Sequence, residues 1–204
     1  EGVRPWCETY NGTSWTEVGD LQMARMTKMG TVGTSTAAMS FAGGDTPIGP
    51  QKVNEIWDGT SWTEGADLNT ARRGVAALGI ANTAAICAGG NMPGATAITE
   101  SWNGTSWTEV NNLTSARSAA VGAGTVTSGL VFGGNGVLTE KYDGTSWTEV
   151  GDLTVGRDQG GGAGGAAATT AALAMSGDSP TGGPNAATEE WNDPVYTIKT
   201  VTVS

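Results

Sequence analysis

The side chains with the greatest potential for acid–base chemistry are glutamates that recur along the chain. One row comprises Glu8, Glu55, Glu100, Glu140 and Glu189, and a second comprises Glu17, Glu64, Glu109 and Glu149. The chain has no histidine, which removes the commonest general base, metal ligand and partner of a nucleophilic Ser or Cys. A catalytic pair is normally unique, whereas these glutamates are repeated. We therefore expect structural glutamates, no catalytic residue, no metal site, no cofactor and no enzymatic activity.

Arginines follow the first row of glutamates at a constant distance. The interval from Glu55 to Arg72 is 17 residues, and three further glutamates have an arginine at the same interval. We expect structural ion pairs, in which an arginine bridges to a glutamate of its own unit or of a neighbouring one. The residues of these pairs are Glu55, Arg72, Glu100, Arg117, Glu140 and Arg157. The alternative is a ring of arginines that binds an anion at a central channel, against which the negative net charge argues.

The glutamates belong to a repeat that runs through the sequence. The segment Gly-Thr-Ser-Trp-Thr-Glu occurs around Trp15, Trp62, Trp107 and Trp147, at spacings of 47, 45 and 40 residues. This period indicates a repeat architecture and not a single core with one active site. Function is therefore expected in the connecting loops.

One unit contains four runs of strand length. They are Val75–Ile80, Ala84–Ala88, Ile98–Trp102 and Ser106–Val110, each bounded by Gly, Asn or Asp. The first two runs are small and apolar, as crowded inner strands should be, and the last two alternate polar and aromatic residues, as outer strands should. The Asn-Gly or Asp-Gly pair before each repeated tryptophan predicts a tight hairpin with positive φ at both central positions.

Four short strands closed by paired glycines are typical of a propeller blade. The pairs Gly43-Gly44, Gly89-Gly90 and Gly133-Gly134, the aromatic residues Trp57, Trp102 and Tyr142, and the following arginines resemble kelch repeats; the pair is replaced by Gly177-Asp178 in the last unit. The resemblance implies an all-β, kelch-like β-propeller of four-stranded antiparallel blades. The Asp/Asn-Gly-Thr-Ser-Trp-Thr-Glu-Val variant resembles repeats in structural proteins of marine bacteriophages. Copper oxidases of the kelch type use His ligands, which this chain does not supply.

The repeats fill a single domain, residues 1–204. Counted from each arginine, the units are 25–71, 72–116, 117–156 and 157–204, and residues 1–24 remain as a leading half-blade hairpin. The last unit has a plausible fourth strand at Val195–Val203. We expect four to five blades, with five favoured and one of them incomplete; the alternative is four blades with an extra hairpin.

Composition restricts the partners. With 10 basic and 20 acidic residues the net charge is −10, which disfavours nucleic acid and anionic membranes. No apolar run approaches the roughly 18 residues of a membrane span. The start at Glu1 shows no signal peptide and suggests a processed or partial chain, and the composition favours a virion or extracellular location. Cys87 is expected to be a small buried hydrophobic residue, with no disulfide to Cys7 and no redox role.

The loops between the second and third strands of each unit (the middle loops) vary most. They differ in length and composition while the remainder of the unit is constant, which favours recognition, although unselected loop variation gives the same pattern. The middle loops are Asp45–Gln51, Asn91–Ala95, Asn135–Val137 and Asp178–Ala186. The candidate ligand-binding residues are Asp45, Ile48, Gln51, Asn91, Met92, Asn135, Asp178 and Asn185.

These observations favour a non-enzymatic structural and recognition module of a virion, such as a fibre, spike or decoration domain. Its expected partners are a host surface glycan or a neighbouring virion protein, and it could form a homo-oligomer. The alternatives are a secreted carbohydrate-binding or carbohydrate-active propeller and a kelch protein-interaction adaptor.

Overall fold

The computed structural model describes residues 3–25, 29–45, 49–134, 136–165, 170–179 and 183–193, and these residues form strands and turns but no helix. No helix in these ranges could therefore span a membrane. Three sheets have four strands each. They are β3 (Gly30–Thr34), β4 (Ala37–Phe41), β7 (Asn54–Trp57) and β8 (Trp62–Glu64); β9 (Ala76–Ala81), β10 (Ala84–Ala88), β11 (Thr99–Trp102) and β12 (Trp107–Val110); and β13 (Val121–Thr125), β14 (Ser128–Phe132), β15 (Thr139–Tyr142) and β16 (Trp147–Glu149).

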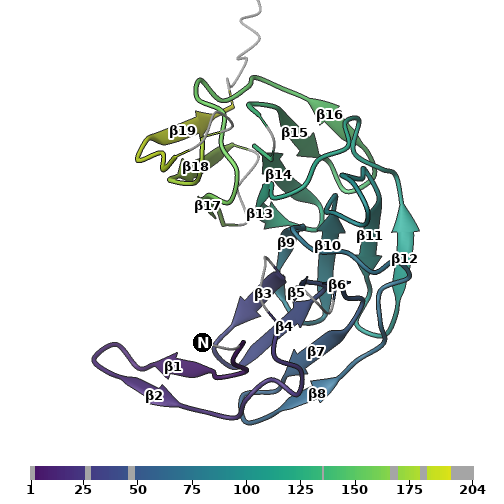
Figure 1. Ribbon diagram of the computed structural model, residues 1–204, viewed down its shortest axis with the longest axis vertical. Helices are drawn as coiled ribbons and strands as arrows, with labels where there is room; N and C mark the ends of the chain where they lie inside the picture. Colours follow the sequence, from purple (N-terminus) through teal and green to yellow (C-terminus); the bar gives the residue numbers. More distant parts are fainter. Residues whose placement is uncertain are drawn as a thin grey trace, which may run out of the picture.

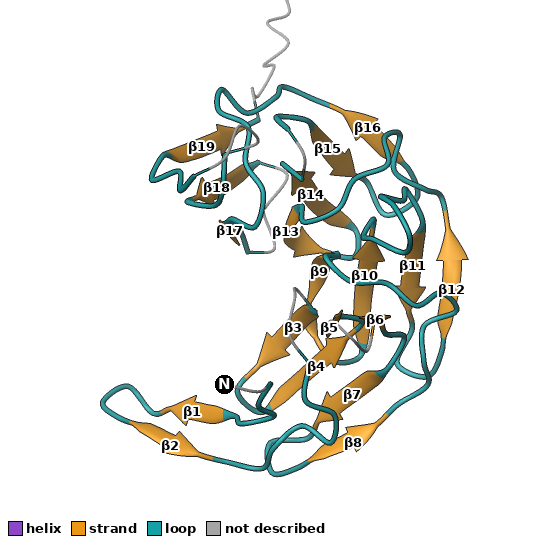
Figure 2. Cartoon of the chain, viewed as in Figure 1, coloured by secondary structure: helices purple, strands orange, loops and turns teal. Residues whose placement is uncertain are grey.

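A fourth sheet contains the described strands β17 (Gly161–Ala163), β18 (Ala171–Met175) and β19 (Thr188–Asn192). Its expected last strand at 195–203 lies outside the described residues. Each sheet is an antiparallel meander, and the four sheets follow one another in a propeller arrangement along an open arc (Figure 1). The cartoon coloured by secondary structure shows the same succession of strands and loops (Figure 2).

The N-terminal hairpin forms a separate two-stranded sheet of β1 (Glu8–Tyr10) and β2 (Trp15–Glu17) beside the first blade (Figure 1). The described residues thus form four blades and an additional hairpin. This agrees with the expected four to five blades: no inner strand pair joins β1 and β2 in the part of the chain that is described, so the hairpin stands either as the incomplete fifth blade or as an extra hairpin beside four blades.

Each outer hairpin closes through a four-residue turn and not through the tight two-residue turn expected from the sequence. Asp58 lies between β7 and β8, where its Oδ1 accepts backbone hydrogen bonds from Thr60 (2.8 Å) and Ser61 (2.9 Å). Only Gly59 in this turn has a positive φ, of 96°. The carboxylate therefore satisfies the turn's donors, as Asn also does at the same position of other units.

The residues that follow the second strand also correspond from blade to blade in a different way than the paired glycines of the sequence suggest. The N–H groups of Ala42, Gly89 and Gly133 bond to the start of the third strand, so Ala42-Gly43 corresponds to the pair Gly89-Gly90. In the fourth blade Ser176 occupies the same place. This first position requires a positive φ, and Ala42 and Ser176 adopt values of 59° and 54° without being glycines. The sequence alignment is displaced by one residue in the first and fourth units, because it relies on glycine as the marker of that conformation.

Neighbouring blades meet through their inner strands and through a layer of aromatic residues. The inner strands β3, β9, β13 and β17 lie side by side toward the inside of the arc. A Cβ on Gly122 of β13 would lie 2.2 Å from the carbonyl oxygen of Ala77 on β9, so only glycine permits this approach. Farther out, Phe41 of the first blade packs edge-on against Trp107 of the second, with ring centroids 4.9 Å apart.

Candidate functional site

The repeated charged residues meet in pairs inside the blades. Arg72 Nη2 donates to Glu100 Oε1 at 2.8 Å, and both side chains are buried. Arg72 precedes the first strand of its blade and Glu100 lies on the third, so the pair joins two parts of the same blade. Of the two arrangements that the sequence left open, the structure has the pair within one unit.

The arginine also satisfies backbone carbonyls at the point where the second strand ends and the third begins. Arg72 Nη1 donates to the carbonyl oxygens of Gly89 (2.8 Å) and Ile98 (2.6 Å). Its Nε has no hydrogen-bond partner among the described residues. The guanidinium thus connects both ends of the middle loop to the start of the blade.

The glutamate accepts two backbone hydrogen bonds from the segment that enters the blade, and a third hydrogen bond from the side-chain amide of Asn69 at 2.9 Å. The N–H of Asn69 lies 2.7 Å from Glu100 Oε2 and that of Thr70 lies 3.3 Å from Oε1. These donors stand three and two residues before Arg72, and donors at the same two places bind the glutamate of every other blade. The donors in the other blades are Gln22 and Met23, Thr114 and Ser115, and Thr154 and Val155.

The full arrangement, an arginine, a glutamate and two entering N–H groups, is the arginine–glutamate site of a blade. The other three pairs are Arg25 with Glu55, Arg117 with Glu140, and Arg157 with Glu189. The entering N–H donors are functional groups that sequence reasoning missed. The only sign of these donors in the sequence is their constant distance from the arginine. A backbone N–H can come from almost any residue type, so the donor positions show no preferred residue.

Burial and hydrogen bonding perturb the ionisation of two of these groups. Burial lowers the pKa of the Arg25 guanidinium, although the carboxylate of Glu55 opposes this effect. Burial alone would raise the pKa of Glu189, but hydrogen bonds from Thr154, Arg157 and Val155 outweigh it and hold the pKa below its ordinary value. A carboxylate that accepts from several donors, as Glu189 does, is poorly suited to take up a proton.

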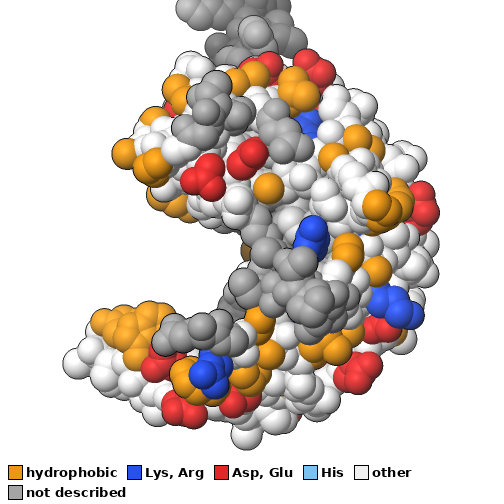
Figure 3. Space-filling view, viewed as in Figure 1, with side chains coloured by type: hydrophobic (Ala, Val, Ile, Leu, Met, Phe, Trp, Pro, Cys, Tyr) orange, Lys and Arg blue, Asp and Glu red, His pale blue; other side chains and the backbone are white. Residues whose placement is uncertain are grey.

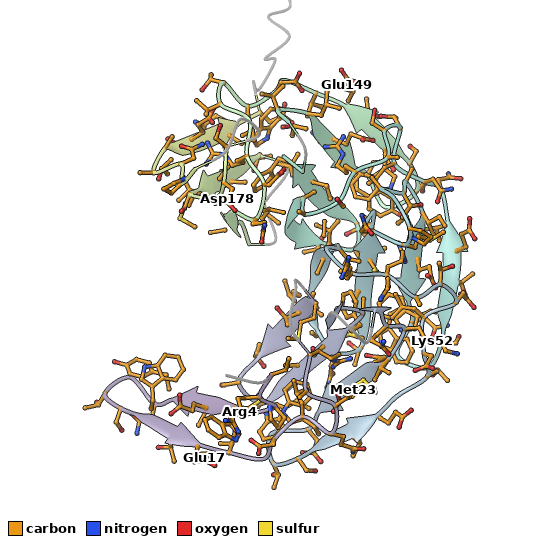
Figure 4. The ribbon with its side chains drawn as sticks, in the orientation of Figure 1. Arg4, Glu17, Met23, Lys52, Glu149 and Asp178 are labelled. Carbon is orange, nitrogen blue, oxygen red and sulfur yellow. The ribbon has the colours of Figure 1, made fainter. Side chains whose placement is uncertain are left out.

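The second row of glutamates lies on the surface. Glu109 stands directly opposite Glu100 in the register of β11 and β12, yet it is exposed. Glu17 and Glu149 point outward from β2 and β16 (Figure 4). Among the described residues, no three His, Cys, Asp or Glu side chains are grouped so that they could hold a metal ion.

Each middle loop has a base and a tip. The base is formed by the residues at the two ends of the loop, whose backbone hydrogen bonds recur from blade to blade, and the tip is the variable segment between them. The base bonds to the backbone of the following blade's arginine: Gly90 N–H donates to Arg117 O at 2.9 Å, and Arg117 N–H donates to Thr96 O at 3.1 Å. Gly43 and Gln51 make the same two bonds to Arg72, and Gly134 and Gly136 make them to Arg157. The middle loops and the connections between blades therefore lie on the same face, as the four-stranded meander predicts.

Several candidate ligand-binding residues belong to the base and not to the tip. Gln51 accepts from Arg72 N–H through its carbonyl, and its side chain donates to Gly49 O at 3.2 Å. Asn91 exchanges two backbone hydrogen bonds with Arg73, at 2.7 and 3.1 Å. Asn185 Oδ1 accepts from Ala187 N–H at 2.9 Å. These residues help to hold the loops, Asn91 through its backbone, Asn185 through its side chain and Gln51 through both.

The remaining candidates are more accessible or fall outside the description. Met92 is half-buried next to the exposed Pro93, and Asp178 is exposed near the end of the arc (Figure 4). Asp45 is described only in its backbone, as part of the short pair β5 (Gly44–Asp45) and β6 (Gly49–Pro50). Ile48 and Asn135 lie outside the described residues. On the face seen in Figure 3, charged side chains are scattered and form no large patch of one sign.

Two of the hollows in the described part of the chain bear on ligand binding. One, of about 280 Å³, is lined by small inner-strand residues such as Thr31, Ala77 and Gly122, with no arginine among them, so the anion-binding ring is not formed there. The other, of about 330 Å³, lies between the N-terminal hairpin and the first blade, and is lined by Tyr10, Trp15, Trp57 and Trp62 together with smaller residues. Sequence reasoning missed this aromatic hollow because the same residues are scaffold in the other units.

Comparison with known proteins finds no protein-family model and no curated protein that matches the sequence.

Proposed function

We propose that the protein is a non-enzymatic recognition module of kelch-like type, carried on a virion as a fibre, spike or decoration domain of a phage. In this proposal the tips of the middle loops contact a host surface glycan or a neighbouring virion protein. The repeated sequence variant with its resemblance to phage structural proteins supports the setting. The absence of histidine and the repeated hydrogen bonding of the glutamates support binding over catalysis.

One observation supports the assignment of recognition to the face that bears the middle loops. The backbone bonds at the base of the middle loop are the same in three blades, whereas five residues, Asn91 to Ala95, separate Gly90 from Thr96 and only Asn135 separates Gly134 from Gly136. A rigid base with a free tip lets surface loops vary without loss of the fold. Binding surfaces built on constant scaffolds have this organisation.

The direct test is a loop replacement. A variant in which Asn91–Ala95 is replaced by a single Asn keeps the bonds of Gly90 and Thr96 to Arg117 and removes the tip. Its binding to an array of neutral surface glycans should be lost, while circular dichroism stays that of the parent. Thr105→Ala, in an exposed outer turn, is the matched control and should bind as the parent does.

Two results would overturn this face assignment: a folded loop variant that binds as well as the parent, or binding that falls steeply with salt. An acidic module has no counterion release from a polyanion to exploit, so binding should depend weakly on ionic strength. The virion setting has its own test, since the protein should purify with intact phage particles. Its consistent absence from them would contradict that part.

A further inference from the structure

The N-terminal hairpin has the bonding of the outer half of a blade. Leu21 N–H donates to Pro5 O at 3.1 Å and Val18 N–H to Cys7 O at 3.0 Å. In the first blade Leu68 and Gly65 make the same bonds, to Lys52 and Asn54. The register also matches, because Tyr10 stands opposite Trp15 as Trp57 stands opposite Trp62. The strands β1 and β2 therefore correspond to β7 and β8, the third and fourth strands of a blade.

The inner edge of this half-blade is unpaired within the described chain. In the blades the third strand bonds to a second strand on one side and to a fourth on the other, as β11 does with β10 and β12. The strand β1 pairs only with β2. An open strand edge with free N–H and C=O groups accepts a further strand.

The same half-blade contains a carboxylate without its cation. Glu8 occupies the position of Glu100, but it is exposed and no hydrogen bond or ion pair joins its side chain to another described residue. Glu100 accepts from an arginine and two entering N–H groups. The donors that complete this site in each blade come from the segment that leads into the inner strands.

Aromatic side chains on the hairpin are exposed where their counterparts are buried. Trp15 is 66% exposed, whereas Trp107 and Trp147 at the same position are 5% and 6% exposed. Tyr10 is 51% exposed, against 2% for Tyr142. Figure 3 shows the hydrophobic atoms of this end of the molecule gathered on its surface. Such a concentration of exposed aromatic area marks an interaction site.

The hollow beside the hairpin lies where an inner strand would place an apolar side chain. Between the first and second blades, Phe41 from the second strand packs on Trp107 of the following blade. The equivalent tryptophan of the first blade is Trp62, which is only half-buried and lines the hollow with Trp15. A large apolar residue from a second strand next to β1 would fill this space.

We propose that the hairpin is a docking site for a β-strand pair that has the chemistry of this chain's own inner strands and comes from outside the described residues. This segment carries an arginine, followed by two short strands of small residues with a large apolar side chain near the end of the second. Its second strand pairs antiparallel with β1, its arginine binds Glu8, and its apolar side chain enters the hollow against Trp62. The open edge of β1 specifies the strand, the carboxylate of Glu8 specifies the arginine, and the hollow beside Trp62 specifies the apolar side chain.

The test uses a peptide copied from the chain itself. Thr114–Gly134 contains the entering N–H donors, Arg117, the two inner strands and Phe132, and it has no Trp or Tyr. The labelled peptide should bind the protein saturably with one site, and Trp emission should shift to shorter wavelength as Trp15 is covered. An Arg117→Gln peptide, or Glu8→Gln in the protein, should weaken binding at least about tenfold, as expected for a charge-assisted pair. Glu17→Gln, opposite Glu8 on β2, is the control and should bind as the parent does.

A tethered form covers the case in which the free peptide is insoluble. Thr114–Thr139 is joined directly before Glu8 in place of residues 1–7, which restores the spacing from Arg117 to Glu140. This protein should melt at a higher temperature than the same fusion with Arg117→Gln in the added copy, and its Trp15 should be protected from quenching by acrylamide. Equal melting temperatures with Trp15 still exposed would refute the proposal.

Three other results would also refute it. They are peptide binding that is indifferent to both Glu8 and the peptide arginine, self-association of the parent that covers Trp15 and excludes the peptide, and a neutral glycan that protects Trp15 at the hollow while the peptide does not bind.

Discussion

Arg72 and Glu100 are 28 residues apart in the chain, and their side chains meet at 2.8 Å with almost no access to solvent. The contact joins the start of a blade to its third strand. A charge pair in such surroundings is stabilising only while both members are present, because a remaining single charge is buried without compensation.

Glu100→Gln should therefore destabilise the protein strongly. The substitution leaves Arg72 buried without its counter-charge, which costs about 3–5 kcal/mol of unfolding free energy. Chemical denaturation monitored by tryptophan fluorescence measures the change. Glu109→Gln is the matched control, since Glu109 stands opposite Glu100 but is exposed, and it should change the unfolding free energy by less than about 0.5 kcal/mol. Equal effects of the two substitutions would contradict a structural role for the buried pair.

Gly122→Ala should disturb the contact between the second and third blades. Its Cβ would lie 2.2 Å from the carbonyl oxygen of Ala77, a backbone atom that cannot turn aside. Overpacking of this kind costs about 1–3 kcal/mol or more. Gly136→Ala is the control, because nothing lies within 4 Å of the added carbon. Thermal unfolding of both variants measures the difference, and a Gly122→Ala protein as stable as the control would show that the inner strands can separate at little cost.

The outer turns should make the protein sensitive to acid. Hydrogen bonds from the backbone of Ser61 and Thr60 lower the pKa of Asp58 below its ordinary value of 3.8, and the same kind of bonds lower that of Asp143. The folded state thus binds fewer protons than the unfolded state, so this stabilisation is present above about pH 4 and is lost as the pH falls below 3.8 through the folded pKa.

Asn takes the place of Asp at this turn position in other units, as at Asn103, and supplies a variant with the same turn. The double variant Asp58→Asn/Asp143→Asn should lose less stability than the parent as the pH falls from about 4 to below 3, where these carboxylates take up protons. Melting temperatures measured across this range test the expectation. Parallel curves for the two proteins would mean that these carboxylates do not contribute to acid unfolding.

The two cysteines should differ in reactivity. Burial raises the pKa of the Cys87 thiol to about 12, and its side chain is inaccessible, so almost no thiolate is present at neutral pH. Cys7 is half-buried and belongs to the N-terminal hairpin. Iodoacetamide should modify Cys7 in the native protein and Cys87 only after denaturation, as read by mass spectrometry of digested peptides. Modification of Cys87 at the native rate of Cys7 would show that the second blade opens readily.

Much of the fold could be predicted from the sequence because the repeat supplies four aligned copies of the same pattern. The strand expected at Ala84–Ala88 has these bounds in the structure, the two strands after it begin one residue later than expected, and the strand before it is shifted by one residue at both ends. The turn after β7 was wrong in type because the role of Asp58 as an acceptor depends on the backbone conformation of the next three residues. The position of Ala42 was wrong because its positive φ is imposed by the bonds around it and not by its own preference.

The candidate site was less accessible to prediction. Residues such as Gln51 and Asn91 stand in variable loops, but their backbones belong to the constant base, which sequence alone does not separate from the tip. Trp15 looks identical to Trp107 in sequence, and only the sheet pairing shows that one is exposed and the other buried. Exposure of a repeated residue depends on which neighbours are present, and this information is not contained in the repeat itself.

In every arginine–glutamate site the arginine precedes the glutamate in the chain, and this order has a consequence for biosynthesis. Arg72 is translated before Glu100, and the distance of 28 residues takes roughly one to six seconds at ordinary elongation rates. During this interval the guanidinium cannot be neutralised by its own partner, so a blade can close only after its third strand has left the ribosome. Each closed blade then presents a finished surface to the next one, and the ribosome thereby imposes an order of assembly from the amino to the carboxyl end.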